Sequence, residues 1–126
     1  MEKFELKIER KLIVTAEDMD DIMCAALENG ICYWCDEAIV VGTYLGEFAS
    51  DQISRGGELI LVDAEDGSEY LLTREKLLHG IQMAREQEYY RDYEWWDGEK
   101  LDTYNVDAEV ADVIVQLALF DEIVFG

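Results

Sequence analysis

Residues 58–72 have the sequence Glu-Leu-Ile-Leu-Val-Asp-Ala-Glu-Asp-Gly-Ser-Glu-Tyr-Leu-Leu. The apolar runs at 58–63 and 68–72 are typical of two strands. The Asp66-Gly67 pair between them is a strong signal for a hairpin turn. An antiparallel sheet is therefore expected at the centre of the chain.

Helix signals flank this hairpin on both sides. Thr73 is expected to cap a helix that runs to about Tyr93, although Gly80 weakens it by roughly 1 kcal/mol relative to alanine. Thr15 is the expected N-cap of an earlier helix that ends at Gly30. Two further helices are expected, a short one over 46–55 and a last one capped by Asp107, after a loop over 97–106.

Three more stretches favour strands. Residues 2–14 alternate apolar and charged side chains, which is the period of a half-buried strand. Residues 38–41 form a short apolar run, and 122–125 can add a short strand at the end. The sum is one acidic α+β domain over residues 1–126, with a mostly antiparallel sheet and about four helices.

The net charge is the unusual feature of the composition. Thirty acidic residues face ten basic ones, for a formal net charge of -20. Residues 1–11 carry a net +1, while residues 12–126 hold six basic and 27 acidic residues, a net -21. Such a charge makes the compact state repel itself, so the acidity costs stability.

This charge balance decides between classes of partner. Direct nucleic-acid binding needs lysine and arginine against phosphates, and anionic membranes repel the same surface, so neither is expected. A basic nucleic-acid-binding protein is the favoured partner. The first residues lack the apolar core of a signal peptide, and three cysteines do not form a disulfide framework, so we expect a cytoplasmic protein.

Cysteine and histidine offer the alternative of a metal or redox site. Cys32 and Cys35 form a C-x-x-C pair, and only Cys24 and the single His79 could complete a zinc site. Neighbouring carboxylates would raise the thiol pKa of this pair, which disfavours redox chemistry. We therefore interpret the cysteines as buried apolar residues and expect no metal, no cofactor and no catalytic residue, with a metal-binding protein as the open alternative.

The most informative stretch is 86–109, which combines nine carboxylates with six tyrosines and tryptophans. Side chains three or four residues apart share a helix face, so on a helix Glu88 would lie beside Asp92 and Tyr89 beside Tyr93. Such a row can take the place of phosphates before a basic groove, and aromatic side chains can stack on guanidinium groups. The expected phosphate mimics are Glu86, Glu88, Asp92, Glu94, Asp97, Glu99 and Asp102, and the expected anchors are Tyr90, Trp95 and Trp96.

Three segments carry a resemblance to small acidic proteins of phages and prophages of gut bacteria. They are Ala-Leu-Glu-Asn-Gly-Ile-Cys-Tyr-Trp-Cys (26–35), Tyr-Leu-Gly-Glu-Phe-Ala-Ser-Asp-Gln-Ile-Ser-Arg-Gly-Gly (44–57) and Leu-Phe-Asp-Glu-Ile-Val-Phe-Gly (119–126). In size and acidity the chain also resembles anti-CRISPR and anti-restriction proteins, many of which imitate nucleic acid.

The sequence thus predicts a phage-type inhibitor in the bacterial host cell that blocks the basic channel of a nuclease or CRISPR effector. Two alternatives stay open. One is a structural or regulatory phage module that assembles with itself, as a homodimer for example, without mimicry. The other is the Cys/His metal-binding protein.

Overall fold

The computed structural model describes residues 1–6, 11–90 and 95–126. Its main sheet is antiparallel with the strand order β1-β2-β3. The strands are β1 (Cys35–Val40), β2 (Leu59–Asp63) and β3 (Glu69–Leu72). The expected hairpin between β2 and β3 is confirmed, and Gly67 in its turn has φ +75°, which a side-chain-bearing residue adopts only with strain.

Three α-helices are present among the described residues, and each begins at an expected cap. They are α1 (Ala16–Ala25), α2 (Arg74–Glu86) and α3 (Ala108–Phe120), capped by Thr15, Thr73 and Asp107. The Thr15 hydroxyl accepts from the Asp18 N–H at 3.1 Å, and the Asp18 carboxylate accepts from the Thr15 N–H at 3.0 Å, which forms a capping box. A π-helical turn, η1 (Ala26–Gly30), extends α1 to the expected end at Gly30.

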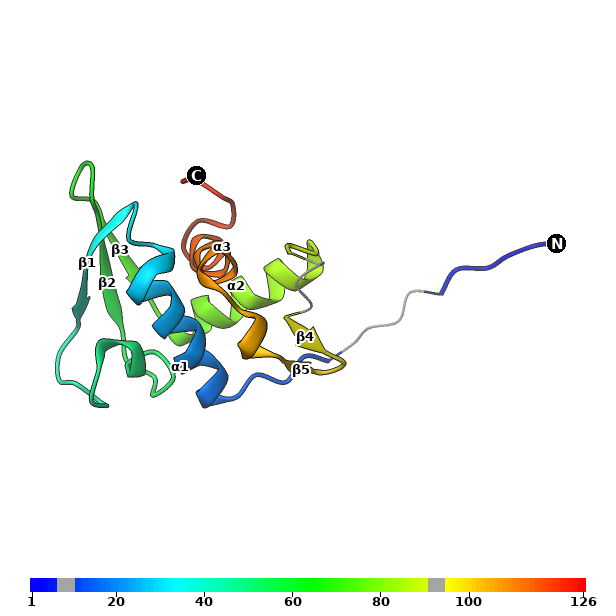
Figure 1. Ribbon diagram of the computed structural model, residues 1–126, viewed down its shortest axis with the longest axis horizontal. Helices are drawn as coiled ribbons and strands as arrows, with labels where there is room; N and C mark the ends of the chain where they lie inside the picture. Colours follow the sequence, from blue (N-terminus) through cyan, green and yellow to red (C-terminus); the bar gives the residue numbers. More distant parts are fainter. Residues whose placement is uncertain (7–10, 91–94) are drawn as a thin grey trace.

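All three α-helices lie on one side of the sheet (Figure 1). A single apolar core joins the inner sheet residues Leu59, Leu61 and Leu72 to the helices, and α3 is buried from Val110 to Ala118 except at Asp112. A Cβ added at Gly80 of α2 would collide with the backbone carbonyl of Ile114 and lie 2.8 Å from the backbone nitrogen of Ala118. Gly80 therefore allows α2 and α3 to pack closely and is not a weak point of α2.

Two expected elements in the middle and at the end of the chain are absent from the described residues. The helix over 46–55 is reduced to a 3-10 turn, η2 (Ala49–Asp51), so about four helices becomes three α-helices. Residues 122–125 form no strand, because the N–H groups of Val124 and Phe125 bond to the Gln116 side chain instead of a neighbouring strand.

The expected strand over 2–14 is wrong for its described residues. Residues 2–6 have no regular structure, and Phe4 and Leu6 are each 83% exposed. Residues 11–14 make a single parallel bridge, between Ile13 and Lys100, and 7–10 lie outside the described residues. Alternation alone cannot form a strand where no neighbouring strand supplies hydrogen-bond partners.

Candidate partner-binding surface

The chain leaves the helical path directly after α2. Glu88 and Tyr90 have φ angles of 55° and 52°, in the left-handed region, so the expected helix to Tyr93 is wrong at residues 87–90, while 91–93 lie outside the described residues. Glu88 is therefore not helical, so it cannot share a helix face with Asp92 as expected. Asp92, Tyr93 and Glu94 lie outside the described residues.

Trp95 explains why the chain turns here. Its side chain is 0% exposed, its indole N–H donates to the Tyr89 carbonyl at 2.9 Å, and its ring meets Trp96 edge-on with centroids 4.7 Å apart. Burial of a large aromatic side chain favours this path over another helical turn. The expectation that Trp95 lies on the surface as an anchor is therefore wrong, while Tyr90 and Trp96 are half-buried.

A small hairpin presents two of the expected carboxylates. It consists of β4 (Trp96–Asp97) and β5 (Lys100–Leu101), where a loop was expected. Gly98 has φ +59° in the turn, and Asp97 and Glu99 are exposed on either side of it. The Ile13 N–H donates to the Glu99 carbonyl, so the segment before α1 fixes the hairpin in place.

A second set of carboxylates belongs to the turn that follows this hairpin and to the helix that contacts it. Tyr104 is 95% exposed and belongs to the 3-10 turn η4 (Thr103–Asn105). The Thr103 hydroxyl donates to Asp21 of α1 at 2.7 Å, which brings a carboxylate from far along the sequence to this turn. We name the set Asp21, Asp102, Tyr104 and Asp107 the Tyr104 cluster.

Hydrogen bonds to neutral groups orient the carboxylates of the Tyr104 cluster. Asp102 accepts from the Asn105 side-chain amide at 3.0 Å, and Asp107 accepts from the Val110 N–H at 2.9 Å. Asp21 and Tyr104 are not among the residues that the sequence predicts for a partner-binding surface. Tyr104 lay in the acidic stretch, but no sequence signal connects Asp21 to it.

Cations do not neutralise the Tyr104 cluster or the β4–β5 hairpin within the described part of the chain. Among pairs of described residues, the only contact within 4.0 Å between a basic nitrogen and a carboxylate oxygen joins His79 to Asp121, at 2.6 Å. Lys100 is opposite Asp97 in the hairpin register, yet the two make no ion pair at that distance. Asp21, Asp97, Glu99, Asp102 and Asp107 therefore have no lysine or arginine within 4.0 Å among the described residues.

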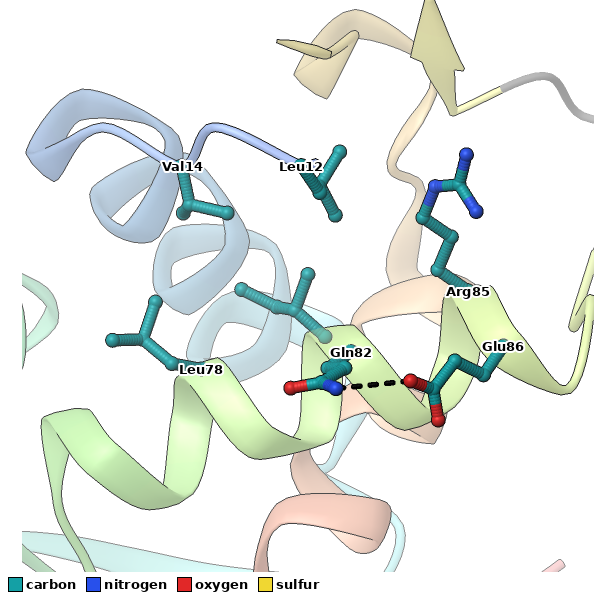
Figure 2. A pocket seen from close by; sticks show the side chains of 7 residues that line it. Leu12, Val14, Leu78, Gln82, Arg85 and Glu86 are labelled. Atoms are coloured by element: carbon teal, nitrogen blue, oxygen red, sulfur yellow. Dashed lines mark hydrogen bonds between the residues drawn. The ribbon is translucent and has the colours of Figure 1, made fainter. Parts of the chain in front are cut away.

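A groove of about 480 Å³ lies between α2 and the segment before α1 (Figure 2). Leu12 and Val14 face Leu78 across it, and the Gln82 amide donates to Glu86 at 2.9 Å along its edge. Arg85 stands at one end.

Arg85 is the cation that lines this groove. Its guanidinium carbon lies 5.2 Å from the centroid of the Trp96 ring, and its Nε is buried without a hydrogen-bond partner. A cation over an aromatic face is attracted by the ring electrons. Trp96 is thus already in contact with a guanidinium of its own chain, and Glu86 lines the same groove as this cation.

The cysteine and histidine alternative finds no assembled site. Among residues 1–6, 11–90 and 95–126, no three His, Cys, Asp or Glu side chains come close enough to hold a metal ion. Burial raises the pKa of the Cys35 thiol, and this thiol donates to the Glu37 carbonyl at 3.3 Å. Cys32 is exposed and donates to the Leu27 carbonyl at 3.4 Å, while His79 pairs with Asp121 at the end of α3.

Comparison with known proteins leaves the resemblance to phage proteins as a prediction. No protein-family model matches the chain, and no curated protein or solved structure matches it either. Within the described residues, none of the helices has the length and apolar character that a bilayer crossing requires.

Proposed function

We propose that the chain is a phage-type inhibitory binding protein of the anti-CRISPR or anti-restriction class. It acts in the cytoplasm of the bacterial host and is not an enzyme. Its Tyr104 cluster and β4–β5 hairpin enter the basic nucleic-acid channel of a host nuclease or CRISPR effector. The carboxylates there take the place of phosphates, and Tyr104 takes the anchoring role first expected for Trp95.

The observation that carries this proposal is an almost fully exposed tyrosine in a turn whose carboxylates have no lysine or arginine beside them among the described residues. Tyr104 is 95% exposed, and none of Asp21, Asp102 and Asp107 has a described lysine or arginine within 4.0 Å. Tyrosine presents a large rigid area at low entropic cost and is enriched among residues that dominate binding energy. An exposed tyrosine of this kind fits an interface better than a free surface.

The long-range charge supports the same proposal. A formal net charge of -20 attracts a basic channel from a distance, which accelerates association and makes it sensitive to salt. Fixed carboxylates also suit mimicry because hydrogen bonds to Asn105 and the Val110 N–H hold Asp102 and Asp107 in position before a partner arrives.

Inhibition of DNA cleavage tests the proposal. A pull-down from bacterial lysate at increasing salt concentrations first identifies the nucleases or CRISPR effector complexes that bind the chain. Each is then purified, and its cleavage of labelled DNA is measured with and without the chain. We expect inhibition that weakens as salt rises. Tyr104→Ala should weaken binding about tenfold or more, as for an interface residue worth roughly 2 kcal/mol.

A matched pair of charge variants isolates the acidic face. Asp97→Asn with Glu99→Gln removes two exposed charges from the hairpin, and Glu47→Gln with Glu65→Gln removes two exposed charges elsewhere. We expect the first pair to weaken inhibition and the second to leave it near wild type. Equal losses in both pairs would show that only the net charge matters, and no recovery of a nucleic-acid-binding protein at any salt concentration would refute the proposal.

A further inference from the structure

The outer face of the sheet, turned away from the helices, carries an unbroken apolar row. The register places Ile39 opposite Ile60 and Ile60 opposite Leu71, so these three side chains lie side by side across β1, β2 and β3. Ile39 is 38% exposed and Leu71 is 40% exposed. We name Ile39, Ile60 and Leu71 the outer apolar row.

A second row beside it ends in carboxylates. Glu37 is opposite Val62, and Val62 is opposite Glu69, so an apolar centre has one carboxylate at each end. The two rows are two residues apart along each strand, which corresponds to about 7 Å. Both Glu37 and Glu69 are exposed, and neither forms an ion pair with a described residue.

This face departs from the usual pattern of a sheet with one solvated side. An antiparallel sheet packed on one face normally turns polar residues to water on the other. Here four of the six outward positions in the two rows carry isoleucine, valine or leucine, although the three α-helices cover only the inner face (Figure 1). Apolar area at these positions contributes nothing to the core and fits a surface that is covered in a complex.

Charge decides which occupant fits this face. A second copy would bring its own Glu37 and Glu69 and its own net charge of -20 against the same groups, which is repulsive. A partner with apolar residues bordered by cations meets both rows favourably.

We propose that the outer face of the sheet binds a basic amphipathic helix of a partner protein. Three strands place Glu37 and Glu69 two strand spacings apart, or about 10 Å. Seven residues of α-helix rise about 10.5 Å. A helix that lies across the strands therefore sets an apolar stripe on the outer apolar row and two lysines or arginines, seven positions apart on one flank, against Glu37 and Glu69.

This binding site is separate from the one in the proposed function. The helices lie between the outer sheet face and the β4–β5 hairpin (Figure 1), so either surface can bind without the other. Variants of the sheet face leave Asp97, Glu99 and Tyr104 unchanged, which keeps the two tests independent.

A labelled synthetic helix serves as the probe. The peptide contains leucine, alanine and lysine, with a leucine stripe and lysines at seven-residue spacing on one flank, and fluorescence anisotropy measures its binding. A second peptide has the same composition in an order without an apolar face. We expect the amphipathic peptide to bind more tightly than the scrambled one by about tenfold or more. Because both peptides carry the same charge, this difference measures the contribution of the apolar stripe.

Two pairs of variants assign the binding to this face. Ile39→Thr with Leu71→Thr places a β-branched residue, which favours strands, at both positions and should weaken binding about tenfold. Leu6→Thr with Ile123→Thr alters exposed apolar residues outside the sheet and should not weaken it. Glu37→Gln with Glu69→Gln should weaken binding and flatten its salt dependence, and Glu47→Gln with Glu65→Gln is the control of equal charge.

Three results would overturn the proposal. One is equal binding of the two peptides, and another is an equal effect of the sheet variants and their controls. The third is a wild-type dimer in sedimentation that Ile39→Thr with Leu71→Thr dissociates, since a second copy would then be the occupant.

Discussion

Gln116 holds the C-terminal segment against the fold, and its replacement should release that segment. The side chain is 0% exposed on the inner side of α3. Its carbonyl oxygen accepts from the Val124 and Phe125 N–H groups, both at 2.8 Å. Its amide nitrogen lies 3.1 Å from the Phe125 carbonyl and 2.9 Å from Asp112. One side chain therefore satisfies three backbone groups of the tail.

Gln116→Met lowers the free energy of unfolding by the smaller of two amounts, according to whether the C-terminal tail stays in place or detaches. If the tail stays in place, the Val124 and Phe125 N–H groups lose their acceptor at about 1–3 kcal/mol each, and the Phe125 carbonyl keeps the Tyr33 hydroxyl as its donor, at 3.3 Å. If it detaches, water satisfies those groups and the loss is the packing of Phe125, whose ring stacks on Trp34 with centroids 4.7 Å apart. That packing is worth about 1.5–3 kcal/mol for burial and about 0.5–1.5 kcal/mol for the aromatic pair. We expect release of the tail and a loss of about 2–4 kcal/mol.

A double-mutant cycle with Phe125→Ala measures this coupling by urea denaturation. For a chain of this length each kcal/mol lowers Tm by about 4 °C, so Gln116→Met should lower Tm by about 8–16 °C. In that background Phe125→Ala should cost under about 0.5 kcal/mol more, because its ring has already left Trp34. Full additivity of the two changes would refute the idea that Gln116 retains the tail.

Three further predictions concern other parts of the fold. Burial, followed by the hydrogen bond to Asp112, raises the Tyr33 pKa from 10.0 to about 12, so the free energy of unfolding should fall as pH rises through this window. Denaturation of Tyr33→Phe over the same window should show a smaller fall. Trp95→Ala should cost about 3–5 kcal/mol in urea denaturation, while Tyr104→Ala, on the surface, should change stability by under about 0.5 kcal/mol. Gly80→Ala should lower Tm by the equivalent of about 1–3 kcal/mol, although alanine favours helix, because the added methyl group meets the backbone of α3.

Elements with local signals were predictable from the sequence. The three helix caps at Thr15, Thr73 and Asp107 and the Asp66-Gly67 hairpin turn are confirmed, because a cap or a tight turn depends on residues within four positions. The α+β class follows from these elements. The alternation over 2–14 failed because a strand depends on a partner that the local sequence does not contain.

The site was less predictable because its geometry depends on contacts across the chain. Tyr90, Trp95, Trp96 and Tyr104 look equivalent in the sequence, yet they range from 0% exposed at Trp95 to 95% exposed at Tyr104. Which one faces water is set by the turn after α2 and by the docking of η4 on α1. The bond between Thr103 and Asp21 spans 82 positions, so no local pattern indicates it.

The carboxylates that the fold holds in place are satisfied by neutral donors. Asp112 accepts from the Trp34 indole at 2.8 Å, and Asp63 accepts from the Tyr70 hydroxyl at 3.1 Å. Asp20 and Asp21 accept from the hydroxyls of Ser54 and Thr103, at 2.5 and 2.7 Å. A lysine or arginine donor would cancel the charge of the carboxylate to which it bonds, whereas a hydroxyl or an indole leaves that charge intact. Even the carboxylates that stabilise the fold thus add to the field outside the molecule, and a partner rich in lysine and arginine would be the group that compensates it.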